Sequence, residues 1–598
     1  MNMNIFSGAL PARNIRSPRN TDMLFFFVFI AITAFNLWKV PYGTITNDES
    51  LYLAIPYRFM QGDSILFHEW NPSQMSALLL LPAVKLYYTL VPSGEGIYLA
   101  FRYLYIFFHS LASIYIYIYI IRSTEELPGS YPAALTASAI YLIYSYSNIM
   151  ALSYNSMSIG LMVLVCLTMR SLSGELWKLI FVGIAFSGAV LCCPYLVLCY
   201  MAFSFAVFFR WVLHRRIPKG EDLLAHAFSL KSWAVITGVC FCLASAFCIF
   251  AFVGKDISLL KEIIPRIMYN NEHPQRTFVE LIKGLYGTFY RNNSFFKPVL
   301  LSSIVLCAVI TADKKRCLHR ALYLIAASSI TLLYSATYLL MYRETNVMLL
   351  PFSILGFFAY LLCEKKDVKS FVLIYIPGAI LCFCFYLSSN MGVGAISGVS
   401  AVSMIASIIF VFRLLGEMRA QYCHKKSFAR YFSVFSGIIS LSVILILFGG
   451  ITYTRALKCF REDGVSGLTE RVTCGSAKGL KTTPEKAADF ELKYSELSPL
   501  REIGNGNVLY FSDEIWRYLE DPKRCASSSM WLSTGSTEQN LQTLSLQEKY
   551  WELFPEKFPD YVYIRADLAK DPVFMAAWGK YEYTLTDSDN CVILCMNK

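Results

Sequence analysis

The segment TITNDESLYLAIPYRFMQGDSILFHEWNPSQ, residues 44–74, follows the first long apolar stretch of the chain. It carries four acidic residues, Asp48, Glu49, Asp63 and Glu69, where a chain leaving a bilayer first meets water. Such a cluster is either a solvated linker or a reaction centre held at the membrane surface. The sequence on either side of it bears on that choice.

The composition is that of a polytopic membrane protein. Of 598 residues, 56% are hydrophobic, 15% aromatic and only 16% charged, whereas soluble domains carry roughly a quarter charged residues. Apolar runs long enough to cross a bilayer recur along the chain. The net charge of +11 would suit a nucleic-acid partner. Because the basic residues gather in short loops between apolar runs, no nucleic-acid partner is expected.

Apolar runs of roughly 20 residues predict about thirteen membrane-spanning helices. The basic loops between them fall on one side, which the positive-inside rule assigns to the cytoplasm. Residues 1–21 are then a cytoplasmic tail before an uncleaved first span, residues 22–451 form the transmembrane domain, and the C-terminus lies outside. The predicted spans are 22–40, 98–121, 132–148, 154–169, 178–193, 195–212, 232–253, 299–312, 321–341, 347–363, 371–388, 399–415 and 431–451.

Three large segments face outside in this topology, namely 41–97, 254–298 and 452–598. The last is polar, and about 150 residues suffice for one domain. Within it, NVLYFS and DYVYIRA predict strands, SLQEKYWELFPEKF a helix between them, and YEYTLTDSDNCVILCMNK a closing hairpin. These elements indicate a small extracytoplasmic α/β domain. Cys459 and Cys474 lie outside, where the sequence is compatible with a disulfide and with two free thiols.

The middles of the predicted spans carry almost no Asp, Glu, Lys or Arg. Ion-coupled transporters keep ionisable groups there despite a cost of about 2.5–3.5 kcal/mol each. The sequence also has no clear internal repeat of the kind that relates the two halves of many carriers. Both observations disfavour a transporter and direct attention to the first external loop.

The first external loop predicts two helices that lie along the membrane surface. Asn47 or the threonine before it caps the first helix, which places Asp48 and Glu49 in its first turn, where the helix dipole favours negative charge. Pro56 should kink or divide this helix. The second, PSQMSALLLLPAVKLYYTL, is apolar but interrupted by Pro82. Spacing alone explains Asp48 and Glu49 equally well as helix-capping acids.

A first external loop that opens on an acidic pair and forms two surface helices resembles that of the GT-C membrane glycosyltransferases. These include the protein O-mannosyltransferases and the bacterial aminoarabinose transferases of lipid A. The sharpest match is NDESLY, with weaker matches in HEWNPSQ and GIYLAFRYLY. The resemblance covers the overall plan of the chain. It implies a membrane glycosyltransferase with a polyprenyl-phosphate sugar donor and an acceptor glycan, lipid or protein approaching from outside.

The resemblance also implies roles for the acidic pair. Asp48 takes the position of the catalytic acidic residue, and Glu49 completes the pair. Because polyprenyl phosphate is already a good leaving group, the main task is to accept the proton of the incoming nucleophile. One base, without a second nucleophilic carboxylate, gives an inverting displacement.

Tyr52, His68 and Glu69 are predicted to support the site. Glu69 resembles the acidic residue of a Glu-Lys-Pro-Pro segment in the family. Here Trp70 and Asn71 stand in place of the Lys and the first Pro, so the usual phosphate-contacting Lys is missing. Some GT-C enzymes hold a divalent metal at the acidic site, for which Asp48 and Glu69 are candidate ligands. No other cofactor is expected.

The donor phosphate must be met by cations, for which Arg offers a bidentate fork. Arg102 stands where the family has an Arg at the start of the second span. Contact with lipid headgroups explains each single cation as well. The candidate donor-phosphate ligands are Arg58, Arg102, Lys85, Arg266, Arg276 and Arg343.

Three other functions remain open at the level of sequence. A lipid-linked glycan polymerase or ligase handles similar donors, but usually keeps its functional Arg and His residues in late external loops. A polytopic transporter or flippase is the second alternative, and a catalytically inactive membrane scaffold the third. For the leading function we expect a multi-pass protein of the bacterial inner membrane with its active site on the extracytoplasmic face. The sugar and the acceptor are not indicated by the sequence.

Overall fold

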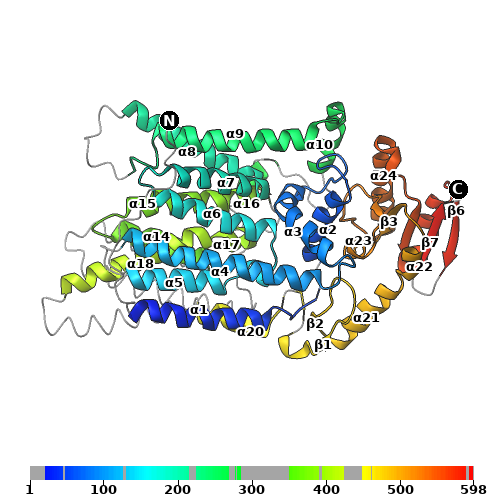
Figure 1. Cartoon of the computed structure of the whole chain (residues 1–598), viewed down its shortest axis with the longest axis horizontal. Coiled ribbons are helices and arrows are strands. Elements are labelled where there is room, and N and C mark those ends of the chain that lie inside the picture. Colours follow the sequence, from blue (N-terminus) through cyan, green and yellow to red (C-terminus); the bar gives the residue numbers. More distant parts are fainter. Residues whose placement is uncertain are drawn as a thin grey trace, which may run out of the picture.

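A computed structural model describes residues 20–44, 47–124, 130–213, 224–268, 277, 279–284, 349–388, 393–422, 448–459, 461–462, 464–587 and 591–596. The predicted spans 299–312 and 321–341, and most of the span 431–451, lie outside these residues. In Figure 1 a bundle of helices packed side by side leads into a second region built of helices and strands.

The helices of the bundle follow the apolar runs of the sequence. They are α1 (Asn20–Lys39), α4 (Ile97–Thr124), α5 (Ser130–Ile143), α6 (Tyr154–Arg170), α7 (Leu176–Cys192), α8 (Val197–Leu213), α9 (Leu230–Phe252), α14 (Leu349–Leu362), α15 (Val368–Ser370), α16 (Ile376–Ser388), α17 (Val393–Val399), α18 (Ala401–Tyr422) and α20 (Gly450–Leu457). A π-helical turn, Phe371–Tyr375, joins α15 to α16.

Six helical segments within the described residues are long and apolar enough to cross a membrane. The predicted membrane-spanning character is therefore confirmed in part, whereas the total of about thirteen spans and the orientation stay predictions. Three shorter apolar helices, Tyr154–Arg170, Leu176–Cys192 and Phe352–Leu362, accompany them. The six segments are Asp22–Lys39, Ile97–Ile121, Pro194–Val212, Leu230–Phe252, Val368–Ser388 and Ala401–Met418.

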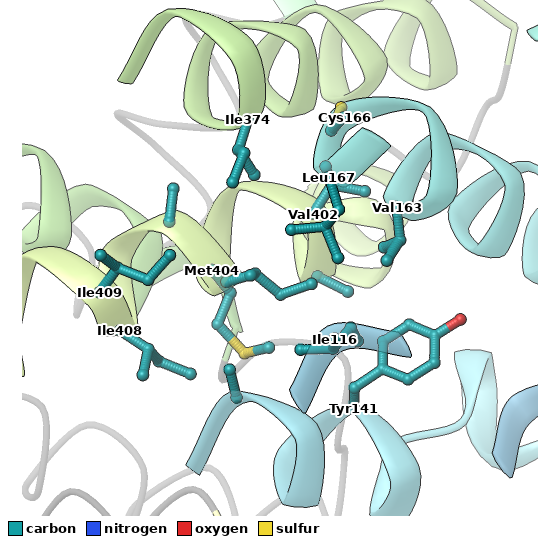
Figure 2. Close-up of a cluster of buried hydrophobic side chains, with 14 of the residues drawn as sticks. Ile116, Tyr141, Val163, Cys166, Leu167, Ile374, Val402, Met404, Ile408 and Ile409 are labelled. Carbon is teal, nitrogen blue, oxygen red and sulfur yellow. The ribbon is translucent and has the colours of Figure 1, made fainter. Parts of the chain in front are cut away.

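The helix α18 lies at the centre of the bundle. In its span 89% of the residues are buried, against 11% for the span in α9. Figure 2 shows Met404, Ile408 and Ile409 of α18 among side chains that include Ile116 of α4 and Tyr141 of α5. Small residues allow this close packing, because a Cβ at Gly356 or Gly378 would overlap α18 at Ser407 or Ser403.

Two helices of the first loop lie between the bundle and the C-terminal region, as Figure 1 shows. They are α2 (Asn47–Met60) and α3 (Ala77–Leu90), which confirms the two helices expected there. Pro56 lies inside α2 and does not divide it. The packing of the buried residues Leu53, Ile55 and Phe59 outweighs the hydrogen bond that Pro56 cannot make.

The C-terminal region contains a five-stranded sheet in the order β4-β3-β5-β7-β6. Its strands are β3 (Asn507–Phe511), β4 (Arg524–Cys525), β5 (Tyr561–Arg565), β6 (Tyr583–Asp587) and β7 (Cys591–Met596). β3 runs parallel to β4 and β5, whereas β7 runs antiparallel to β5 and β6. The two predicted strands and the closing hairpin are thus β3, β5 and β6–β7. Cys459 and Cys474 are both free thiols.

Helices and a small hairpin complete this region. The predicted helix between β3 and β5 is α24, whose cap, Ser536, accepts a hydrogen bond from the Gln539 amide. The short strands β1 (Glu470–Arg471) and β2 (Lys481–Thr482) pair beside the end of α1. The helices are α21 (Pro484–Ser495), α22 (Ser498–Glu502), α23 (Arg517–Glu520), α24 (Thr537–Leu553), α25 (Ala566–Ala569) and α26 (Pro572–Trp578).

The first loop shares its hydrophobic core with the C-terminal region. Leu51 and Ile55 of α2 belong to one buried cluster with Tyr510 and Trp516. Farther along the loop, Phe67 and Trp70 join a second cluster with the sheet and with Ile263 of α10 (Leu260–Met268). The loop is therefore fixed from two sides.

Candidate active site

The acidic pair at the start of α2 is split between two environments. Only 3% of Glu49 is exposed, whereas Asp48 is half-buried. Successive residues of a helix point about 100° apart, so neighbouring carboxylates on α2 face different parts of the protein. The two residues are therefore suited to different tasks.

Glu49 is held by Arg102 at the start of α4. Arg102 donates from Nε to Glu49 Oε1 at 2.7 Å and from NH2 to Glu49 Oε2 at 2.6 Å. Its guanidinium also donates to the carbonyls of Val40, Tyr42 and Gly43, at 3.0–3.3 Å. An Arg has five N–H groups, and these five bonds engage them all. Arg102 was predicted to bind the donor phosphate, but in this structure it has no N–H left for one.

Asp48 lies among tyrosines. It is within electrostatic reach of Tyr52 on α2, Tyr146 in the turn before α6, and Tyr154 at the start of α6. The rings of Tyr52 and Tyr154 meet edge to face with their centroids 5.8 Å apart. Burial, followed by neighbouring Tyr154 and Asp48, raises the pKa of the Tyr52 hydroxyl well above its usual value. Tyr52 therefore stays protonated and is a hydrogen-bond donor beside the carboxylate.

The turn between α5 and α6 has a strained backbone that positions Tyr146. Ser147 and Asn148 adopt φ of 51° and 59°, which is uncommon for residues other than glycine. Such conformations cluster at functional sites. The Tyr146 ring lies against Gly398 of α17, where a Cβ would overlap it. After the turn, a capping box of Ser153 and Ser156 starts α6 at Tyr154.

Sequence reasoning did not include Tyr146 and Tyr154 in the site. The segment YSYSNIMALSYN contains both, and its uneven spacing between two apolar helices was the available signal. Neither helical nor strand periodicity applies across an irregular turn, so their approach to Asp48 could not be inferred from the pattern.

Arg58 and Glu69 are paired with each other rather than directed at an open site. Both are fully buried, and Arg58 NH1 donates to Glu69 Oε2 at 2.9 Å. Arg58 also donates from Nε to Asp63 Oδ2 at 2.6 Å and from NH2 to the Ser527 carbonyl at 2.7 Å and the Tyr550 hydroxyl at 3.0 Å. This Arg58 cluster joins the first loop to the C-terminal region.

His68 and Asp63 extend the Arg58 cluster. The amide of Ser64 donates to His68 Nδ1 at 3.0 Å. Burial lowers the pKa of His68 to about 3, so the ring is neutral at physiological pH. Burial also raises the pKa of Asp63, but Arg58 and Lys557 outweigh it and hold that pKa below its usual value. In this structure His68 and Glu69 therefore stabilise the first loop as parts of the Arg58 cluster.

The remaining candidate cations differ in their surroundings. Lys85 is exposed on α3. Arg266 on α10 lies 5.7 Å from the centroid of the Trp70 ring and 3.9 Å from a carboxylate oxygen of Glu262. Its NH1 group is buried and has no hydrogen-bond partner among the described residues. Arg276 and Arg343 lie outside those residues.

No group of three or more His, Cys, Asp or Glu side chains that could hold a metal ion occurs in the part of the chain that the structure describes. Glu69 accepts from Arg58 and from the amides of Asn71 and Met530, at 2.9–3.2 Å. Both oxygens of Glu69 are therefore already bonded to N–H donors of the protein.

A scan against protein-family models and a search of curated proteins both find no match. Among solved structures, the chain aligns with the oligosaccharyltransferase AglB from Archaeoglobus fulgidus, in complex with an inhibitory peptide and a dolichol-phosphate. That alignment has 14% identity, a TM-score of 0.42, and covers 96% of this chain and 74% of AglB.

The chain also aligns with ArnT from Cupriavidus metallidurans. The apo structure gives 12% identity and a TM-score of 0.43, over 96% of this chain and 97% of ArnT. The structure of ArnT bound to undecaprenyl phosphate gives 11% identity and a TM-score of 0.40. AglB and ArnT are both membrane glycosyltransferases of the GT-C superfamily, whose acidic motif NDESLY resembles.

Proposed function

We propose that this chain is a membrane glycosyltransferase that moves a sugar from a polyprenyl-phosphate donor to an extracytoplasmic acceptor. The observation that carries the proposal is the division of the acidic pair. Arg102 holds both oxygens of Glu49, and Asp48 is left half-buried beside three tyrosines. The motif NDESLY, which resembles the GT-C acidic motif, supports the same assignment.

In this mechanism Asp48 accepts the proton of the acceptor hydroxyl or amine as the nucleophile attacks the anomeric carbon. The bond from that carbon to the phosphate oxygen breaks, and the lipid phosphate leaves with the electron pair. Glu49 cannot act as a second acid or nucleophile while Arg102 holds both of its oxygens. Attack by the acceptor from the opposite face therefore inverts the anomeric configuration.

The neighbouring tyrosines have a positioning role in this proposal. The protonated Tyr52 hydroxyl is a donor to the acceptor or to the developing phosphate charge. Among the candidate phosphate ligands that the structure describes, Arg266 has a buried N–H group without a hydrogen-bond partner in the described residues, so it is the candidate for the donor phosphate. Lys85, Arg276 and Arg343 stay candidates on sequence grounds.

The test is transfer by the purified full-length protein from a panel of radiolabelled polyprenyl-phosphate sugars. We expect Asp48→Asn to lower turnover by about 10²–10⁴-fold, with donor binding unchanged. Asp489→Asn on α21 is the matched control, because it removes a carboxylate of which 57% is exposed. Equal turnover by wild type and Asp48→Asn would remove the base assignment.

A further inference from the structure

A lysine and a cysteine meet where the end of α1 reaches the chain that follows α20. Lys39 is the last residue of α1, and Cys459 comes shortly after α20 ends at Leu457. In Figure 1 α1 and α20 run along the same edge of the bundle, beside the β1–β2 hairpin. Both side chains are buried, with exposed fractions of 2% for Lys39 and 4% for Cys459. The mechanism proposed above uses neither this amine nor this thiol.

The contact between the two side chains is short for a hydrogen bond to sulfur. Lys39 Nζ lies 2.6 Å from Cys459 Sγ, whereas the amide nitrogen of Ser527 lies 3.4 Å from Cys525 Sγ. Because sulfur is larger than oxygen, an N–H···S bond should exceed the usual N–H···O length of about 2.7–3.2 Å. A separation of 2.6 Å instead matches a nitrogen and a sulfur that share one covalently bound oxygen atom.

Neighbouring groups hold both atoms in place. Lys39 Nζ also donates to the Lys458 carbonyl at 3.1 Å, and Asn148 Nδ2 donates to the same carbonyl at 2.6 Å. Gly43 adopts φ of 91° beside the thiol, and a Cβ at this position would lie 3.2 Å from Cys459 Cβ. The amine and the thiol are therefore positioned before any reaction, which lowers the entropic cost of joining them.

The charges around Lys39 favour a neutral nitrogen. Among the described residues no carboxylate forms an ion pair with Lys39, and Glu49, which lies nearby, is paired with Arg102. The guanidinium groups of Arg102 and Arg455 both act on the Lys39 ammonium. A buried cation beside other cations is electrostatically costly. A nitrogen bonded to oxygen is a much weaker base than an alkylamine, so such a bond would remove this charge.

A narrow recess gives small molecules access to the pair. Its lining includes Lys39, Arg102, Asn148 and Cys459, and it holds about 20 Å³ of space. This is room for one water-sized molecule, which excludes larger oxidants such as oxidised glutathione. Hydrogen peroxide is close to water in size and oxidises thiols to sulfenic acids. An oxidant of this class can therefore reach Cys459 in the folded protein.

We propose that peroxide joins Lys39 and Cys459 through a covalent N–O–S bridge. A first peroxide molecule transfers one oxygen atom to the Cys459 thiol, which becomes a sulfenic acid, and leaves as water. The O–O bond of a second peroxide then breaks as an N–O bond forms between the Lys39 amine and the sulfenic oxygen. One N–H hydrogen and the sulfenic O–H hydrogen leave with the second peroxide as two water molecules. Sulfur and nitrogen are each oxidised by two electrons, and each peroxide is reduced by two.

The bridge joins residues that are 420 positions apart in the chain. Arg102 binds backbone carbonyls between Val40 and Gly43, so the bridge also fixes the segment on which the pair of Arg102 and Glu49 rests. A cross-link between distant residues stabilises a protein mainly by restricting its unfolded chain. In the predicted topology the pair lies on the extracytoplasmic side, where thiols meet oxidants. The bridge is independent of the proposed glycosyl transfer.

The test is peptide mass spectrometry on the purified full-length protein in detergent, after treatment with hydrogen peroxide or with dithiothreitol. We expect the peroxide-treated wild type to yield a cross-linked peptide that contains Lys39 and Cys459. It should carry one oxygen atom more and two hydrogen atoms fewer than the two separate peptides together. Dithiothreitol should release both peptides unmodified. The apparent Tm should rise with peroxide and return to its starting value with dithiothreitol.

Two variants each remove one partner of the bridge. Lys39→Arg keeps the cation, and Cys459→Ser keeps a small polar side chain. Neither variant should give the cross-linked peptide or the reversible rise in Tm. Cys474→Ser is the matched control, because it removes another free thiol of the C-terminal region and should form the bridge as wild type does.

Four results with the peroxide-treated wild type would overturn the inference. Cys459 could remain a free thiol that is alkylated after unfolding, or become a sulfinic acid while Lys39 stays unmodified. It could instead form a disulfide with Cys474, or a cross-link to Lys39 that lacks the oxygen atom. Because the test measures no turnover, a bridged protein that transfers no sugar would lose the proposed function and keep the bridge. Sugar transfer by a protein that forms no bridge would have the reverse meaning.

Discussion

Arg102 donates to both carboxylate oxygens of Glu49, at 2.7 and 2.6 Å, although the two residues are 53 positions apart in the chain. The same guanidinium binds backbone carbonyls between Val40 and Gly43. One side chain therefore fixes the end of the first span, the start of α2 and the start of α4 relative to one another. Asp48 is held in place by this clamp through its neighbour in the chain.

Breaking the clamp from one side should be costly. We expect Arg102→Met to destabilise the protein by about 3–5 kcal/mol, because Glu49 is left buried without its guanidinium. The double variant Glu49→Gln with Arg102→Met should recover part of this loss. Arg102→Lys keeps the charge but cannot form the fork, so it should remain destabilised. Thermal unfolding of the wild type, Glu49→Gln, Arg102→Met and the double variant gives the coupling free energy, and strictly additive effects would contradict the clamp.

Arg58 should stabilise the junction between the first loop and the C-terminal region. Replacing it by Met leaves Asp63 and Glu69 buried without their guanidinium. This change should destabilise the protein by about 3–5 kcal/mol. Limited proteolysis and hydrogen exchange should show faster opening around residues 61–76 than in wild type. Arg524→Met on β4 is the control, because Arg524 is exposed. If residues 61–76 were equally protected from proteolysis and exchange in Arg58→Met and in the control, the Arg58 cluster would not stabilise this junction.

The buried His68 should make stability depend on pH. Burial lowers its pKa to about 3, from about 6.5 in an unfolded chain. Between these values the unfolded state binds more protons, so the free energy of unfolding falls as the pH drops below about 6.5, by up to about 1.4 kcal/mol per pH unit. The lowered pKa of Asp63 also makes the free energy of unfolding fall as the pH drops, but only below about pH 3.8. Burial raises the pKa of Glu69, so this residue changes the free energy of unfolding with pH in the opposite direction.

The measurement is the apparent Tm at pH 7.5, 6.5 and 5.5 at one scan rate. His68→Asn is the matched variant, because an Asn Oδ1 can accept the Ser64 amide as Nδ1 does. We expect a smaller loss of Tm on acidification in the variant than in wild type. Parallel pH profiles would show that His68 does not set this dependence. The charged groups that act on His68 are Asp63, Glu556, Lys557, Arg58 and Lys255.

The sequence was informative where local chemistry decides structure. Acidic residues favour the first turn of a helix, and α2 begins at Asn47 with Asp48 and Glu49 next. Apolar runs predicted the helices of the bundle, and the short apolar and aromatic runs NVLYFS and DYVYIRA predicted β3 and β5. Each of these signals lies within about 20 consecutive residues, so none required knowledge of distant contacts.

The roles of the charged residues depended on distant contacts. Arg58 and Glu69 belong to one short loop, yet Arg58 also bonds Ser527 and Tyr550, which lie 469 and 492 positions away. Arg102 was expected to bind the donor phosphate, but its N–H groups are engaged by Glu49 and by backbone carbonyls. Spacing predicts which face a residue occupies and not which of its hydrogen bonds are already formed.

Gly398 should be required for activity because it makes room for Tyr146 next to Asp48. A Cβ at this position would overlap the Tyr146 ring, so Gly398→Ala should displace that ring and lower the transfer rate per folded molecule, at a stability cost of about 1–3 kcal/mol. Gly183→Ala is the matched control, since its Cβ would lie 2.8 Å from Val239 Cβ in the contact between α7 and α9. Both variants introduce a methyl group into a tight helix contact, and only one does so beside the acidic pair. Turnover is compared with the folded fraction by size-exclusion chromatography, and the same loss per folded molecule in both variants would remove Tyr146 from the site.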